Sequence, residues 1–401
     1  MKNNRKPTKS LKKTARKIHL WLGLSTGLVV FILAITGCCW VFQKELRGLA
    51  SDFKTVKAEN KPFITATQAK TIAQKVFPQK AIHGVSFGQP DEAIEVIFYQ
   101  AQPEFYQKVY INPYSGKVIK AEDQLSGFFA FVLRGHQYLW LPKAIGAQVV
   151  AIATFLFFTI IVTGLILWWP KNKKGRKQRL RFMWKPTTKW KRKNFDLHTV
   201  TGFYISLFAW VFAFTGCVMA FNWFYFIAFK ATGGTKAPQF IIPNSAKKPS
   251  LAANNPVKPI DQLVPMLRKS VPNATAYELH YPTSDSASIY VEIFQQNEIY
   301  YNVDYRFFDQ YTLKELETPS IYGKYEQATF ADKVIRMNYD IHVGAIGGIA
   351  GKIIAFLASL LTASLPVTGF LIWWGKRKKQ KLNRRQPTTE VKKKAQTIVS
   401  S

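Results

Sequence analysis

Two stretches of the chain share one pattern: HLWLGLSTGLVVFILAITGC, from His19 to Cys38, and HTVTGFYISLFAWVFAFTGC, from His198 to Cys217. Each begins with a histidine, has a glycine four residues later and ends with Thr-Gly-Cys. Each is also apolar over about 20 residues, which is the length that a helix needs to cross a bilayer. The pattern therefore predicts two membrane-spanning helices that carry equivalent histidines.

Two further apolar stretches extend this layout. TGLILWWPKNKK begins at Thr163 and TGFLIWWGKRKK begins at Thr368, so each stretch ends in a tryptophan pair before a basic segment. A histidine precedes each of them, His136 by 27 residues and His342 by 26 residues. The predicted spans are 18–42, 145–169, 198–224 and 349–374. Because the order span, polar segment, histidine, span occurs twice, we expect the chain to be internally duplicated.

The net charge of +33 is concentrated in three segments. Residues 1–17 hold eight Lys or Arg, residues 170–193 hold twelve, and residues 375–401 hold ten against one acid, Glu390. The positive-inside rule places the basic tails 1–17 and 375–401 and the loop 170–197 in the cytoplasm, with the first span kept as an anchor. The charge therefore predicts topology and contact with membrane lipids, and it does not indicate binding to nucleic acid.

The segments 43–144 and 225–348 are then expected on the periplasmic side. In the first, Thr65 or Thr67 is a candidate N-cap for a helix in ITATQAKTIAQKVFP, and IEVIFYQ and FYQKVYINPYSGKVI are typical of strands. The second repeats this plan with IDQLVPMLRKSV, ASIYVEIFQQ and EIYYNVDYRFFDQYTLKEL, but it lacks the turn glycine. The predicted fold is a mainly α membrane protein, with a four-helix transmembrane bundle and two periplasmic α+β domains.

Four histidines occupy matching positions in this topology. His19 and His198 begin spans that run outward, so they are expected at the cytoplasmic face, whereas His136 and His342 precede spans that run inward and are expected at the outer face. Ionisable groups at membrane depth are costly and usually functional. The two other histidines, His83 and His280, fall in the outer segments and resemble ordinary residues of those domains.

Two imidazoles on each face suit the two axial positions of a b-type haem. Zinc and copper normally require more ligands, and acids are scarce near these histidines, with only Asp196 and Asp340 close in sequence. Cys38, Cys39 and Cys217 belong to no CxxC or CxxCH motif. The sequence thus predicts two bis-histidine haem b groups.

Electrons would enter at the inner haem, pass to the outer haem and leave to a periplasmic acceptor. Arg134 and Arg336 are candidates to pair with haem propionates on the outer side. No cytoplasmic segment carries a GxGxxG turn between a strand and a helix, so no flavin or nicotinamide site is expected, and the donor would be a quinol or a cytoplasmic reductant protein.

These motifs resemble the PepSY-associated transmembrane family, from about Ala15 to Trp374, with VYINPYSGKV similar to a PepSY strand-turn-strand. The turn equivalent NVDYRFFDQYTL departs from that pattern. The resemblance implies haem ligation by His19, His136, His198 and His342. It also implies an inner-membrane reductase of ferric siderophores that serves iron uptake.

Two alternatives remain open at this point. Since PepSY modules resemble inhibitory propeptide domains, the chain could be a haem-free binding or regulatory protein with structural histidines. It could also be a metal or haem transporter, which is disfavoured because the spans lack acids and matched Gly or Pro breaks, with Pro366 the one span proline.

Overall fold

A computed structural model describes residues 7–49, 51–170, 173–246, 258–297 and 299–385. The chain forms two compact units. Unit 1 contains the residues up to Cys38, Gly135–Phe214 and the residues from Phe356 on, and unit 2 contains Cys39–Arg134 and Thr215–Ala355. Parts of both basic tails and of the basic loop, together with residues 50, 247–257 and 298, lie outside the described residues.

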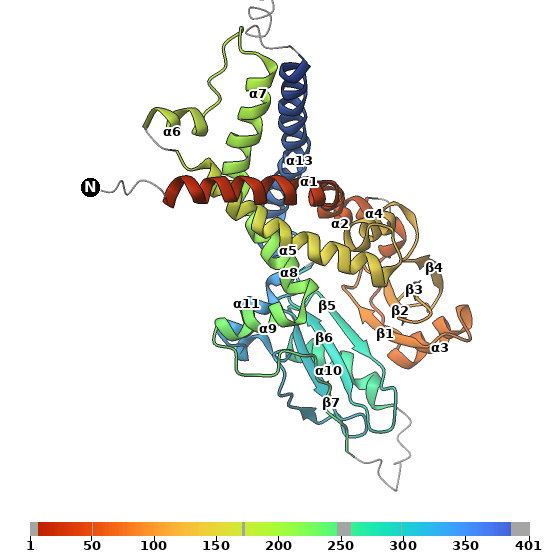
Figure 1. The fold of residues 1–401 in the computed structure, drawn as a ribbon. Helices are drawn as coiled ribbons and strands as arrows, with labels where there is room; N and C mark the ends of the chain where they lie inside the picture. The colour runs from red at the N-terminus through yellow and green to blue at the C-terminus, as the bar shows by residue number, and fades with distance from the viewer. Residues whose placement is uncertain (1–6, 50, 171–172, 247–257, 298, 386–401) are drawn as a thin grey trace, which may run out of the picture. The chain divides into compact units, whose positions relative to one another are not determined.

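Four helical segments in the described part of the chain are long and apolar enough to cross a bilayer. They are Ser10–Val41, Lys143–Trp168, Trp190–Ala220 and Ala345–Lys378. The helices that form them are α1 (Pro7–Val41), α5 (Lys143–Trp168), α7 (Trp190–Asp196) continued by a π-helical turn (Leu197–Thr201) and α8 (Gly202–Ala220), and α13 (Gly348–Arg385) (Figure 1). Large apolar side chains such as Leu28 and Leu207 are exposed on these helices, as on helices that face lipid.

The third span ends earlier than the sequence predicts. Helix α8 ends at Ala220 because the backbone of Phe221 is extended, with φ −127° and ψ 116°, and a separate helix α9 (Asn222–Ala231) follows. The predicted boundary at residue 224 therefore falls inside α9.

Basic side chains bind the carbonyl groups at the end of the second span in unit 1. The guanidinium of Arg179 on α6 (Lys173–Leu180) donates to the carbonyls of Leu167 and Trp168, and Lys12 Nζ donates to the Trp169 carbonyl at 2.7 Å. The last carbonyls of a helix have no intrahelical partner and carry partial negative charge. These cations therefore cap α5 in addition to any role in topology.

Unit 2 is built around one antiparallel sheet with the strand order β4-β3-β2-β1-β5-β6-β7-β8. Its strands are β1 (Ile82–Phe87), β2 (Ile94–Gln100), β3 (Phe105–Ile111), β4 (Val118–Asp123), β5 (Ala276–His280), β6 (Ile289–Phe294), β7 (Asp304–Phe308) and β8 (Glu315–Leu316). The short helices of unit 2 besides α9 are α2 (Gln43–Gly48), α3 (Ala66–Val76), α10 (Pro259–Ser270), α11 (Phe330–Arg336) and α12 (Asn338–His342), and α4 (Gly127–Tyr138) ends in unit 1.

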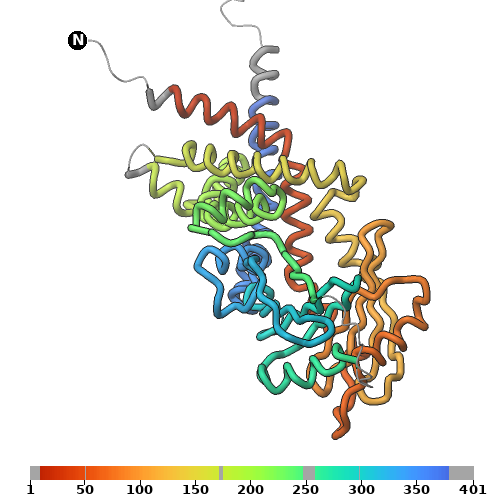
Figure 2. The backbone as a smooth tube through the Cα atoms, turned by 90° about the horizontal axis from the view of Figure 1, so that it is seen from below, coloured from red at the N-terminus to blue at the C-terminus, as the bar shows by residue number. Residues whose placement is uncertain are grey.

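The two predicted outer segments share this sheet. Strand β1 of the first pairs with β5 of the second over four residue pairs, from Gly84 opposite His280 to Phe87 opposite Tyr277. The strands of both segments consequently run side by side in the backbone trace (Figure 2). The sequence predicts two separate domains, whereas the structure joins the two segments at the β1–β5 ladder, which we call the seam.

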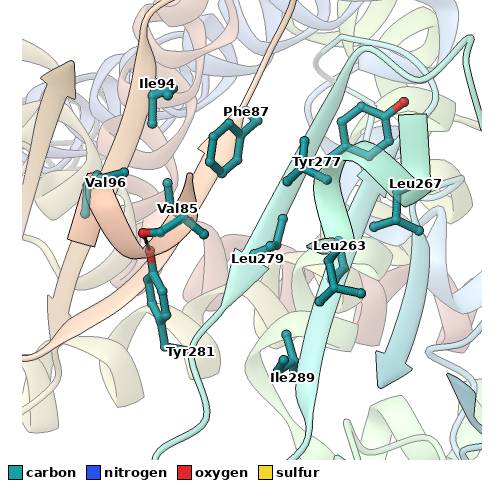
Figure 3. Close-up of a cluster of buried hydrophobic side chains, with 14 of the residues drawn as sticks. Val85, Phe87, Ile94, Val96, Leu263, Leu267, Tyr277, Leu279, Tyr281 and Ile289 are labelled. Atoms are coloured by element: carbon teal, nitrogen blue, oxygen red, sulfur yellow. Dashed lines mark hydrogen bonds between the residues drawn. The ribbon is translucent and has the colours of Figure 1, made fainter. Parts of the chain in front are cut away.

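The hydrophobic core of unit 2 forms where helices α3 and α10 pack against the sheet. Leu263 and Leu267 of α10 lie beside Tyr277 and Leu279 of β5 (Figure 3), and all four side chains are buried. Full burial of such a side chain contributes about 1.5–3 kcal/mol. The core is shared, because the Tyr281 hydroxyl donates to the Ala66 carbonyl of α3 at 2.7 Å.

Thr65 caps α3, as one of the two predicted candidates. Its hydroxyl accepts from the Gln68 amide, and the Gln68 side chain accepts from the Thr65 amide, which completes a capping box. The predicted turn also forms in both segments. The side chains of Asn112 and Asp309 each accept two following amides, and the left-handed position is filled by Gly116, φ 71°, in one turn and Leu313, φ 59°, in the other.

Candidate functional site

His19 and His198 lie close together in unit 1. Their ring centroids are 6.3 Å apart, with the ring planes at 80° to each other. Nδ1 of His19, on α1, lies 3.2 Å from Thr163 Oγ1 and 3.1 Å from the Ile160 carbonyl oxygen of α5. The described structure thus brings together the two histidines that the topology argument assigned to one face.

His198 has the equivalent contact in the second half of the chain. Its Nδ1 lies 3.0 Å from Thr368 Oγ1 of α13, and the Asn194 side-chain amide donates to the Thr368 carbonyl at 3.1 Å. His198 sits in the π-helical turn Leu197–Thr201. Such π-turns are rare and frequently mark functional sites.

The two remaining span-associated histidines repeat the arrangement. In unit 1, His136 Nδ1 lies 3.1 Å from Thr36 Oγ1 and 3.0 Å from the Leu33 carbonyl oxygen. In unit 2, His342 Nδ1 lies 2.8 Å from Thr215 Oγ1. His136 belongs to unit 1 and His342 belongs to unit 2.

All four threonines belong to the Thr-Gly pairs of the four spans, and all four side chains are buried. Three of their hydroxyl groups also bond to a carbonyl of their own helix, at 2.6 Å for Thr36, 2.9 Å for Thr163 and 2.9 Å for Thr368. A hydroxyl has one proton to donate, and a carbonyl can only accept it. The threonine oxygen must therefore accept from the imidazole, so Nδ1 carries the proton and the lone pair is on Nε2.

The glycine of the Thr-Gly pair makes room for the imidazole ring. A Cβ atom on Gly369 would lie 3.1 Å from His198 Cε1, and one on Gly164 would lie 3.2 Å from His19 Cε1. The corresponding distance from Gly37 to His136 Cε1 is 3.5 Å, which is ordinary van der Waals contact. We call each of the four threonines with its histidine an imidazole seat.

Neither His19 nor His198 uses Nε2 for a hydrogen bond to another described residue. For His19 and His198, every hydrogen bond to another described residue is made through Nδ1. Neutral imidazoles held by Nδ1 in this way are the form that binds metal ions through Nε2.

The two candidate arginines have structural partners in unit 2. Arg134 Nη1 donates to the Leu125 carbonyl at 3.0 Å. Arg336 is buried, donates to the carbonyls of Val303 and Gly323, and lies over the ring of Tyr305 at 5.4 Å. Burial lowers the pKa of Arg336. Pairing of either arginine with a propionate stays a prediction.

The two acids nearest the histidines in sequence are also engaged elsewhere. Asp196 accepts from Arg192 Nε at 2.9 Å and from Trp184 Nε1 at 3.2 Å. Asp340 Oδ2 accepts the amides of Tyr300 and Tyr301. Among the described residues, no group of three or more His, Cys, Asp or Glu side chains is arranged to hold a metal ion.

Sequence reasoning found the four histidines but assigned no role to Thr36, Thr163, Thr215 and Thr368. The signal was present, because Thr-Gly occurs in all four spans. Each seat joins residues 100 or more positions apart, so only the fold identifies the partner of each threonine.

Four bilayer-length helices, each with a threonine that contacts a histidine, together with an antiparallel sheet, define a multi-pass membrane protein. The sequence profile of the PepSY-associated TM region matches residues 16–376. The chain therefore belongs to this family. A comparison with curated proteins finds no significant match.

Proposed function

We propose that the chain is a di-haem reductase of the bacterial inner membrane, with one haem b held by His19 and His198 and one by His136 and His342. The observation that carries the proposal is that all four imidazoles have Nδ1 fixed by a span threonine. A histidine that only stabilises a helix interface has no need of a threonine contact at Nδ1 at four related positions.

The rings of His19 and His198 lie close enough for both to hold one metal ion through Nε2. The distance between the His19 and His198 centroids is 6.3 Å. The described residues offer no third ligand there, which favours haem over zinc or copper.

The recurrence of the seats supports an internally duplicated chain. Within each half, a histidine of one span is seated on the Thr-Gly of the next, as in His19 with Thr163 and His198 with Thr368. The positive-inside rule would place both termini and these two histidines on the cytoplasmic side, and the sheet of unit 2 in the periplasm as PepSY-like domains.

Haem in these seats would supply one-electron transfer. The threonines would hold each imidazole in one orientation, and the apolar spans would exclude water around it. The reductant would be a quinol or a cytoplasmic reductant protein. The acceptor would be a ferric chelate, most simply a siderophore in the periplasm, which releases its iron after reduction.

Absorption spectra of the detergent-purified protein, air-oxidised and then dithionite-reduced, test the proposal together with pyridine haemochrome quantitation. We expect a b-type α-band and about two haems per chain, one for each histidine pair. His198→Ala and His342→Ala should each retain one haem, and the matched control His83→Ala should retain both.

A flat spectrum from folded protein made with ample haem would overturn the proposal and favour the haem-free binding protein. Lipid vesicles with a reductant inside and a ferric chelate outside then test the direction of electron flow, with a ferrous-specific dye as the readout. Metal or haem movement without reduction would instead indicate the transporter.

A further inference from the structure

His198 and His342 each end a five-residue motif that occurs twice in the chain. The sequence is NFDLH at residues 194–198 and NYDIH at residues 338–342. An asparagine therefore stands four residues before each histidine, and an aspartate stands two residues before it. Residues four apart on a helix lie on the same face, so the asparagine and the histidine of each motif can contact the same neighbouring helix.

In unit 1, the motif contacts one residue of α13 at two points. The Asn194 side-chain amide donates to the Thr368 carbonyl at 3.1 Å, and His198 Nδ1 lies 3.0 Å from the hydroxyl oxygen of the same threonine. A carbonyl can only accept, so the nitrogen of the Asn194 side chain must face it. Asn194 is 4% exposed, and its Oδ1 has no hydrogen-bond partner among the described residues. An unpaired buried oxygen is costly, so an asparagine at this position requires a role for its amide group.

Unit 2 repeats the two-point contact. The Asn338 side-chain amide donates to the Thr215 carbonyl at 3.1 Å, and His342 Nδ1 lies 2.8 Å from the hydroxyl oxygen of Thr215. The side chain of Asn338 is also buried. The same arrangement therefore forms independently in both halves of the chain.

The aspartate of each motif contacts a different element. Asp196 accepts from Trp184 Nε1 at 3.2 Å, and Asp340 accepts from the backbone amides of Tyr300 and Tyr301. Residues two apart on a helix do not share a face. The asparagine and the aspartate consequently hold each histidine-bearing segment from two directions.

The other two span-associated histidines lack the motif. Ala15 stands four residues before His19, and Val132 stands four residues before His136. Both of these residues are buried and apolar, so neither has a side-chain amide to donate. One histidine of each proposed haem pair thus has the additional contact, and the other does not.

Two contacts with one threonine restrict a histidine more than one contact does. With the imidazole contact alone, the segment could pivot about the Nδ1 to Oγ1 contact, whereas a second contact one turn earlier prevents this movement. We propose that Asn194 and Asn338 are positioning residues, which fix the ring planes of His198 and His342 as axial ligands of haem. This inference rests on the di-haem function proposed above.

The angle between the two rings can be measured separately from haem content. The ring planes of His19 and His198 lie at 80° to each other. In low-spin ferric haem, crossed imidazole planes leave two iron d orbitals of π symmetry nearly equal in energy, which gives a strongly anisotropic electron paramagnetic resonance (EPR) signal. Parallel planes separate these orbitals in energy and give a rhombic signal. Hydrogen bonds behind an axial ligand are one of the means by which a protein tunes a haem.

EPR spectra of the frozen ferric protein, full-length and in detergent, test the proposal. The parent is His342→Ala, in which the proposed haem of His19 and His198 remains, and it should show the strongly anisotropic signal. Asn194→Leu keeps the approximate size of the side chain but removes the amide, so the signal should shift towards the rhombic form. The matched control Asn273→Leu makes the same replacement at an exposed position and should keep the parent signal.

The second motif is tested in the same way. In a His198→Ala background, Asn338→Leu should change the EPR signal of the remaining haem, and Asn273→Leu should not.

The proposal is overturned if Asn194→Leu retains haem with the parent signal, or if the parent itself shows the rhombic signal of parallel rings. If Asn194→Leu retains no haem, hydrogen–deuterium exchange of protein made without haem decides the question. Deuterium uptake by residues 194–201 should then be faster than in Asn273→Leu, and equal uptake would overturn the proposal. A parent without haem would instead overturn the di-haem function, and the same exchange measurement would still test whether Asn194 holds this segment in place.

Discussion

Replacing Thr368 by valine tests the imidazole seat at a single atom. Valine keeps the shape of threonine but removes the oxygen that lies 3.0 Å from His198 Nδ1. Loss of a hydrogen-bond partner costs about 0.5–1.5 kcal/mol, and leaving a buried donor unsatisfied costs about 1–3 kcal/mol. We therefore expect a loss of about 1.4 kcal/mol, or about tenfold in haem affinity.

The assay is a haem titration of protein prepared without haem, followed by the Soret band. The background variant His136→Ala removes a ligand of the proposed second haem, so that the titration reports the His19 and His198 site. Thr368→Ser retains the hydroxyl and should bind haem as the parent does. If the valine variant binds haem with the affinity of the serine variant, then the threonine oxygen does not position His198 and the reasoning fails.

Three further predictions concern other contacts. Gly369→Ala should lower haem retention because its Cβ would lie 3.1 Å from Cε1 of the His198 ring. The Cβ of Gly37→Ala would lie 3.5 Å from Cε1 of His136, so this variant should bind haem normally. Equal haem retention by both variants would contradict the idea that Gly369 makes room for the imidazole ring. Thr65→Ala should destabilise unit 2 by about 1 kcal/mol through loss of the helix cap, measured by urea unfolding, and an unchanged midpoint would argue against the capping box. Lys352 Nζ lies 2.5 Å from Glu45 Oε1. Lys352→Met should lower the melting temperature because it removes the ion-pair partner of Glu45. The double variant Lys352→Met with Glu45→Gln should recover most of this loss.

The spans and most strands could be predicted because their signals are local. An apolar run of bilayer length predicts a span, and alternating aromatic or β-branched residues predict a strand. Both patterns involve only residues that are close in sequence. The helix cap of α3 could also be predicted, because Thr65 and Gln68 are three residues apart and contact each other within one turn.

The seam and the seats could not be predicted from local patterns. Strands β1 and β5 are short and carry polar residues on one face, and they pair across almost 200 residues of chain, from Gly84 to His280. The positive φ of Leu313 could not be predicted either, because a bulky residue seldom adopts this conformation. Here the Asp309 side chain fixes the turn through two amides, so the turn forms without glycine.

The shared sheet has a consequence for a chain cut in two. A break in the basic loop between the second and third spans would leave each fragment with its own histidine and threonine contacts, but with β1 or β5 as an open edge. An open edge strand presents unpaired amides and carbonyls that bind another strand. Co-expressed fragments would therefore find each other through the seam, whereas a fragment made alone would have its edge available for a second copy of itself.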